Sequence, residues 1–98
     1  MKAFLLNEEE TKDLESVLPE WKISQISIQR NFKFNNFIDA FAFMTKVALI
    51  CEKFNHHPNW ENIYSSVNIN LTTHDLGGIS NLDKLLAVEI NNLSEDYL

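Results

Sequence analysis

Residues 35–54, NNFIDAFAFMTKVALICEKF, predict the clearest helix in the chain. At about 100° per residue, one stripe of this helix consists of Ile38, Phe41, Thr45, Ala48 and Glu52. The only strongly polar stripe is narrow, and it consists of Asp39, Lys46 and Lys53. A helix that is apolar nearly all round is usually buried on more than one side, so we expect the chain to associate with copies of itself.

The segments on either side of this helix predict an α+β fold. Before it, residues 7–18 predict a capped helix, and the alternation of apolar residues in 21–34 predicts two strands. After it, residues 62–64 and 67–73 predict a second strand pair, and residues 80–93 predict a last helix with an S-x-x-D cap. The order helix, two strands, helix, two strands, helix predicts an antiparallel sheet with the helices on one face.

The composition is typical of one globular domain spanning residues 1–98, since 45% of the residues are hydrophobic and 22% are charged. The net charge of −6 argues against nucleic acid as a partner, because phosphate contacts supply most nonspecific affinity. The longest apolar run is far shorter than the roughly 18 residues of a membrane span, and we expect no signal peptide. Cys51 is the only cysteine, so we expect a reducing, cytoplasmic compartment.

Three imidazoles and two carboxylates lie at the junctions of the predicted elements, where a rigid scaffold can present them. They belong to Glu52, His56, His57, His74 and Asp83. Glu52 continues the apolar stripe of its helix, so its carboxylate needs a partner. His56, four residues later, can provide one, and such a carboxylate would fix the tautomer of the histidine.

Each of these residues also has an ordinary structural interpretation. The histidines could be solvated or bonded to backbone, Asp83 could simply cap a helix with Ser80, and Trp60 and Tyr64 are typical core aromatics that could instead wall a flat heterocycle. One possible chemistry is a metal site on the histidines and a carboxylate, but no recognised ligand spacing is present. The other is metal-free proton transfer by imidazoles, which we favour.

A longer pattern joins these residues. At the separations found here, it consists of Glu52, His56-His57-Pro58, Trp60, Tyr64, Thr73-His74, Gly78 and Asp83. In the preceding helix it continues through Phe41, Phe43-Met44-Thr45 and Val47-Ala48-Leu49. This pattern resembles the pterin-4a-carbinolamine dehydratases, and the resemblance extends from about Leu5 to the last helix. It implies a four-stranded antiparallel sheet with three helices packed on one face, in the order α-β-β-α-β-β-α.

The resemblance also implies an activity. Family members are hydro-lyases that convert 4a-hydroxytetrahydrobiopterin, or a related tetrahydropterin 4a-carbinolamine, to quinonoid dihydropterin plus water. This step recycles the pterin used by aromatic amino acid hydroxylases, and it requires no metal and no cofactor. The resemblance further implies a homodimer or homotetramer, and it suggests an aromatic amino acid hydroxylase as a protein partner.

Residue roles follow from the matching positions. His56 and His74 are implied as acid–base catalytic residues, and His57 as a catalytic residue that also binds substrate. Glu52 is implied to orient a histidine, with Asn55 beside it. The other residues implied to bind substrate or shape the pocket are Pro58, Trp60, Thr73 and Asp83.

Two positions depart from the pattern. The family often has Asp where this chain has Asn55, and it often has Arg where this chain has Leu82. The first change removes a charge near the histidines, and the second removes an ionic contact. These departures motivate an alternative function, a non-catalytic interaction module on the same fold that binds a hydroxylase or a regulator.

Overall fold

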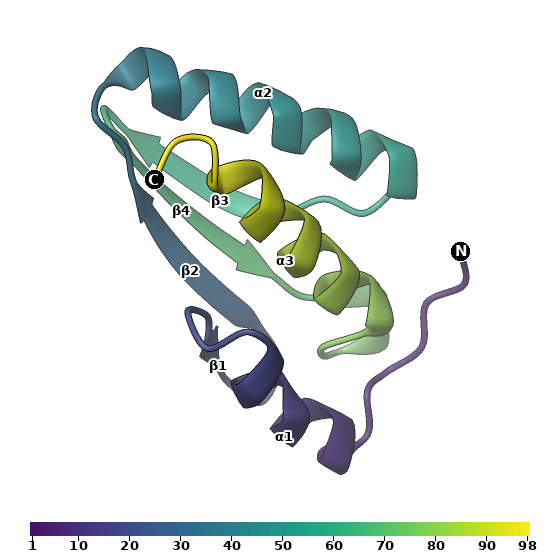
Figure 1. Cartoon of the computed structure of the whole chain (residues 1–98). Helices are drawn as coiled ribbons and strands as arrows, with labels where there is room; N and C mark the ends of the chain where they lie inside the picture. Colours follow the sequence, from purple (N-terminus) through teal and green to yellow (C-terminus); the bar gives the residue numbers. More distant parts are fainter.

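The computed structural model describes all 98 residues, and its elements follow the predicted order (Figure 1). The helices are α1 (Glu8–Val17), α2 (Phe37–Phe54) and α3 (Asn81–Ser94), and the strands are β1 (Lys22–Ile23), β2 (Ile28–Lys33), β3 (Asn59–Ile63) and β4 (Ser66–Leu71). All strand pairs are antiparallel, in the order β1-β2-β4-β3. A short 3₁₀ helix, η1 (His74–Leu76), joins β4 to α3. The α+β prediction is confirmed.

One face of the sheet forms the core. Side chains alternate between the faces of a strand, and the buried ones on β2 and β4 are Ile28, Phe32, Val67, Ile69 and Leu71. They belong to a cluster of 17 buried residues to which all three helices contribute, so the helices cover this face (Figure 1). On the other face, amides and hydroxyls of β2 and β4 are hydrogen-bonded across the strands, namely Gln29 with Asn68 and Asn31 with Ser66.

Side-chain caps start all three helices. Asn7 forms a reciprocal capping box with Glu10 at α1, and Ser80 forms another with Asp83 at α3. Both caps are as the sequence predicted. The side chain of Asn36 caps α2. Each cap contributes about 1 kcal/mol to helix stability. None of the three helices combines the length and hydropathy that crossing a bilayer requires.

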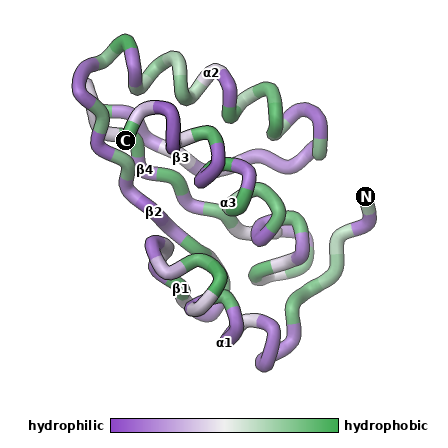
Figure 2. The backbone as a smooth tube through the Cα atoms, in the orientation of Figure 1, coloured by the Kyte–Doolittle hydropathy of each residue, from purple (hydrophilic) through white to green (hydrophobic).

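The face that α2 buries differs from the predicted stripe. The buried residues of α2 are Ala40, Phe43, Val47 and Cys51. The stripe that runs from Ile38 to Glu52 is exposed, and the side chains of Ile38 and Phe41 keep 77% and 56% of their accessible surface. Figure 2 shows apolar residues along the whole of α2, so spacing alone does not select a face. The face of α2 that packs on the sheet is the one on which the smaller residues Ala40 and Val47 flank Phe43, because small side chains permit close packing.

The second strand pair begins earlier than predicted. Trp60, which precedes the predicted strand at residues 62–64, lies in β3 opposite Ile69 and is partly buried against the core. The turn consists of Tyr64 and Ser65, one residue before the predicted position, and Tyr64 has a positive φ of 52°. A turn without glycine carries little sequence signal, which explains the shift. His74 lies in η1, after β4 has ended at Leu71.

The thiol of Cys51 is expected to be unreactive in the native protein. Cys51 is 1% exposed, and burial raises the pKa of its thiol from 9.0 to about 11. Iodoacetamide at pH 8 should therefore leave native Cys51 unmodified but alkylate it in urea, as measured by mass spectrometry. Because the native state binds the thiol proton of Cys51 more tightly than the unfolded state does, the raised pKa contributes to the free energy of unfolding. This contribution is complete below pH 9 and is lost as the pH rises from 9 to about 11. Rapid alkylation of Cys51 without denaturant would contradict the expectation that the native thiol is unreactive.

Candidate active site

All three histidines lie at one polar cavity of about 250 Å³. The C-terminal end of α2 and the segment after β4 meet at this end of the sheet (Figure 1). The residues that line the cavity are Asn55, His56, His57, Thr72, Thr73, His74 and Asp75. The fold therefore brings together the three histidines that the sequence singled out.

The end of α2 makes the two adjacent histidines diverge. Asn55 adopts the left-handed conformation, with φ 50° and ψ 45°, and its N–H donates to the last carbonyls of the helix. Asparagine is among the few residues other than glycine that tolerate this conformation. Pro58 favours extended backbone at His57. As a result the side chain of His56 is largely buried, whereas the side chain of His57 is 52% exposed.

His56 is held by a buried carboxylate. Its Nε2 lies 2.5 Å from Oδ1 of Asp83, and Asp83 is completely buried. The other oxygen, Oδ2, accepts hydrogen bonds of 2.8 Å from the Thr73 hydroxyl and from the Ser80 N–H. Because a carboxylate only accepts hydrogen bonds, Nε2 of His56 carries the proton. Nδ1 of the neutral ring is then an acceptor.

His57 pairs with the other carboxylate of the predicted set. Its Nε2 lies 2.5 Å from Oε2 of Glu52. The prediction that Glu52 pairs with His56 was wrong, because the left-handed turn at Asn55 sends His56 toward Asp83 and places His57 over the last turn of α2. The side chain of Glu52 is 78% exposed, and a pair this exposed contributes only about 0–1 kcal/mol.

His74 is the least constrained of the three histidines. It is exposed at the start of η1. The only imidazole hydrogen bonds in the chain are those of His56 and His57, so both ring nitrogens of His74 are free to contact a ligand. No group of three or more His, Cys, Asp or Glu side chains has an arrangement able to hold a metal ion.

Three of the remaining predicted site residues, Pro58, Trp60 and Asp83, do not line the cavity. Trp60 packs against the core, and Pro58 shapes the loop before β3. Asp83 lies behind His56, and Thr73, although it lines the cavity, donates its hydroxyl proton to Asp83. Sequence reasoning missed Thr72 and Asp75 as lining residues. Their only signal was their position beside Thr73-His74, and that does not reveal which side chains face a cavity.

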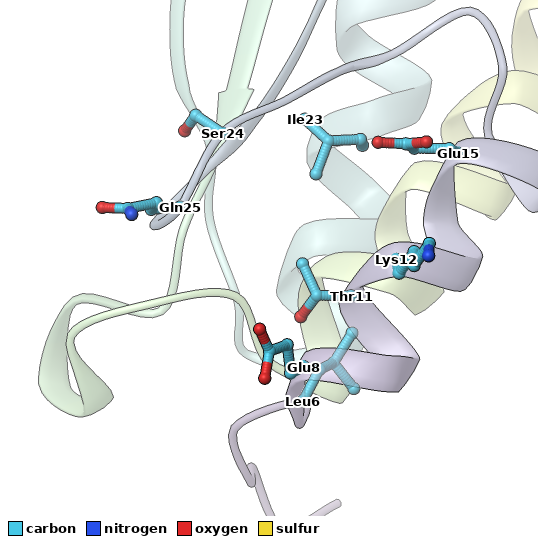
Figure 3. Close-up of a pocket in the computed structure, with 8 residues that line it drawn as sticks. All are labelled: Leu6, Glu8, Thr11, Lys12, Glu15, Ile23, Ser24 and Gln25. Carbon is cyan, nitrogen blue, oxygen red and sulfur yellow. The ribbon is translucent and has the colours of Figure 1, made fainter.

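A wider hollow lies away from the histidines, between α1 and the loop after β1. Its volume is about 760 Å³, and its lining residues are Leu6, Glu8, Thr11, Lys12, Glu15, Ile23, Ser24 and Gln25 (Figure 3). It contains no imidazole, the side chain best suited to proton transfer near neutral pH. The smaller histidine cavity is therefore the candidate active site.

Comparisons with known proteins identify the family of the chain. The family model described as "Pterin 4 alpha carbinolamine dehydratase" matches residues 5–93. The chain is 64% identical over 93 residues to a protein of Prochlorococcus marinus strain MIT 9312 named "Putative pterin-4-alpha-carbinolamine dehydratase", covering 95% of this chain and 97% of the relative. A protein of the same name from Synechococcus sp. strain WH7803 is 50% identical over 91 residues, covering 93% and 98%.

Two solved structures share the fold. One is a transcriptional coactivator/pterin dehydratase from Brucella melitensis, with a TM-score of 0.87 and 37% identity over 92% of this chain and 98% of that one. The other is a pterin dehydratase-like protein described as a RuBisCO assembly factor in the alpha-carboxysome, with a TM-score of 0.63 and 23% identity over 76% and 86%. The second shows the fold alone. The chain belongs to the pterin-4a-carbinolamine dehydratase family, a family of enzymes.

Proposed function

We propose that this chain, acting as one domain in the cytoplasm, dehydrates 4a-hydroxytetrahydrobiopterin or a related tetrahydropterin 4a-carbinolamine. The products are quinonoid dihydropterin and water, and the reaction recycles the pterin used in aromatic amino acid hydroxylation. One observation carries the proposal: three histidines converge on one cavity in a chain of this family.

The reaction needs one proton delivered and one removed. As the C4a–O bond breaks, the lone pair of the neighbouring ring nitrogen forms the C=N bond. An imidazolium supplies the proton that turns the departing hydroxyl into water. A second imidazole, or the same one after reprotonation, takes up the ring proton that is lost. Histidine suits both steps because its usual pKa lies near neutrality, and no net proton is consumed.

The contacts suggest a division of roles. His74 has both ring nitrogens free, and His56 has Nδ1 free while its Nε2 is bonded to Asp83, so we assign these two as the acid and base. His57 is half exposed and is bonded to Glu52, so we assign it to substrate binding. Asp83 contacts His56 rather than the cavity, which makes it a positioning residue.

The direct test uses the purified chain and a carbinolamine generated by a hydroxylase. The appearance of quinonoid product is followed by absorbance, with and without a metal chelator. We expect acceleration over the spontaneous dehydration, and we expect it to persist in chelator. A rate equal to the spontaneous one would refute the proposal, and a rate lost in chelator and restored by metal would favour a metal site instead.

The alternative is a non-catalytic module that binds a hydroxylase or a regulator. Asn55 and Leu82 motivate it. However, Leu82 is buried, with 6% of its surface exposed, and Asn55 fits the left-handed helix end, so both residues have structural reasons to be there. An active protein that captures no hydroxylase in a pull-down would count against this alternative.

We also propose that the chain forms a homodimer or homotetramer through the exposed apolar side of α2. Phe37, Ile38, Phe41 and Leu49 are between 46% and 77% exposed there, more apolar surface than a solvated helix usually carries. Replacing Ile38 and Phe41 together with Asp should convert the assembly to monomer, as measured by light scattering. Val17→Asp on α1, where the side chain is 48% exposed, is the matched control and should leave the mass unchanged. A wild-type monomer would contradict the proposal.

A further inference from the structure

The first residues of the chain are tied to the segment that leads into α3. Residues 2–6, which we call the N-terminal strap, lie along residues 78–81. One antiparallel bridge and two backbone hydrogen bonds join the two segments, namely Leu5 with Ser80, the Leu6 N–H to the Ile79 carbonyl over 2.9 Å, and the Asn81 N–H to the Phe4 carbonyl over 3.2 Å. Terminal residues are usually poorly ordered unless such contacts tie them down.

The side chain of Asn81 also holds the strap. Its Oδ1 accepts the Phe4 N–H over 2.8 Å, and its Nδ2 donates to the Lys2 carbonyl over 3.1 Å. Asn81 is the first residue of α3, where a backbone N–H has no acceptor within the helix. Because the Phe4 carbonyl supplies that acceptor, the strap completes the start of α3.

The start of α3 in turn supports His56. The Ser80 N–H and the Thr73 hydroxyl both donate to Oδ2 of Asp83, and the other oxygen of this carboxylate is bonded to Nε2 of His56. Ser80 and Asp83 are completely buried. In a close-packed interior a displaced group moves its neighbours, so a shift of the Ser80 backbone would also move the carboxylate. Direct contacts therefore run from the strap to the imidazole.

We propose that the N-terminal strap positions the imidazole of His56, and that Asn81 is the positioning residue that couples the two. The inference rests on the proposed function, because it concerns the ring assigned there as acid or base. Gly78 supports it, since this residue is buried and an added Cβ would lie 3.2 Å from Cδ2 of Leu5. The strap thus packs closely against the segment that it holds. Small misplacements of a catalytic group lower kcat by large factors.

The first test observes the His56 ring without substrate. Water-saturation transfer in NMR spectra measures how fast its Nε2–H exchanges with solvent. Asn81→Ala removes both side-chain bonds to the strap and should speed this exchange about tenfold, the effect of about one lost hydrogen bond on a local opening equilibrium. Backbone N–H groups of β2 and β4 report opening of the whole fold and should accelerate by a smaller factor. Asn92→Ala, at an exposed position of the same helix, is the control and should change neither.

A second set of variants changes the strap and leaves Asn81 intact. Phe4→Pro removes the N–H that Oδ1 of Asn81 accepts, whereas Phe4→Ala keeps this N–H and removes only the ring. Phe4→Pro should therefore speed the exchange of the His56 Nε2–H, and Phe4→Ala should behave as the native chain does. Combining Phe4→Pro with Asn81→Ala should add little to Asn81→Ala alone, because both changes remove the same bond.

Kinetics provide a further readout. In Asn81→Ala and in Phe4→Pro, kcat should fall about three- to tenfold while KM stays within about twofold, because orientation of a catalytic group is lost and binding is not. Asn81→Asp keeps the acceptor for the Phe4 N–H and should recover most of the lost kcat.

Equal acceleration of the ring and sheet N–H groups in Asn81→Ala, or a native kcat in that variant, would overturn the inference, because the strap would then only stabilise the fold. The outcome is separable from the proposed function. If the native chain does not accelerate dehydration, the proposed function fails and the ring exchange alone decides this inference. If the native chain is active and Asn81→Ala matches it in kcat and in ring exchange, the proposed function stands and this inference fails.

Discussion

Replacing His56 or His74 with alanine is expected to lower kcat by about 10²- to 10⁴-fold, the usual contribution of a positioned general acid or base. Both rings reach the same cavity, and each retains at least one nitrogen that is not bonded within the chain. The measurement is the rate of quinonoid product formation at saturating substrate, with the spontaneous rate subtracted. Circular dichroism should show that each variant is folded.

His57→Ala provides the comparison within the same cavity. Its ring is half exposed and paired with an exposed carboxylate, so we expect mainly a higher KM. If His56→Ala and His74→Ala both kept the full kcat, the assignment of acid and base would be wrong. If His57→Ala had the largest effect on kcat, the roles of His56 and His57 would have to be exchanged.

Asp83→Ala is expected to reduce the free energy of unfolding by about 3 kcal/mol or more, because each buried donor left without an acceptor costs about 1–3 kcal/mol. The substitution leaves three donors without their acceptor: the Nε2–H of His56, the hydroxyl of Thr73 and the N–H of Ser80. Urea denaturation measures the loss of stability. Activity should fall as well, because the His56 ring is no longer held in one orientation.

If Asp83 only stabilised the fold, its replacement would not change the tautomer of the His56 ring. A spectroscopic measurement of that tautomer therefore separates a positioning role from a purely structural one. Two-bond ¹⁵N–¹H correlation spectra should show the Nε2–H tautomer of neutral His56 in the native chain and a mixture of tautomers in Asp83→Asn, which keeps the size of the side chain. Asp39→Ala, in the first turn of α2, is the control and should cost less than about 1 kcal/mol. An unchanged tautomer in Asp83→Asn would remove Asp83 from the mechanism.

Local signals in the sequence were sufficient for most of the fold. The caps at Asn7 and Ser80 act within four residues of their own position, so they can be recognised without tertiary contacts. The buried face of α2 could not be predicted, because the helix is apolar nearly all round and only packing on the sheet selects Phe43 over Phe41. The turn at Tyr64 was missed by one residue because it contains no glycine.

In the candidate site, too, some features could be predicted from the sequence and others depend on tertiary packing. The three histidines could be singled out from their pattern, yet their partners depend on geometry that spacing does not encode. The left-handed Asn55 decides which histidine turns inward. The pairing of His56 with Asp83, 27 residues away, requires α3 to dock beside the end of α2. Asp75 became visible only when the cavity was defined.

One oxygen of the Asp83 carboxylate accepts the N–H of Ser80 and so caps the start of α3, and the other oxygen is bonded to Nε2 of His56. Under the proposed mechanism, selection for a folded chain and selection for catalysis act on the same side chain. A descendant that lost the activity but kept the fold would still be under pressure to retain this aspartate, whereas His56 and His74 would be free to drift. Among relatives that share this fold, the presence of both histidines, and not the presence of the aspartate, should distinguish the enzymes from proteins with other functions.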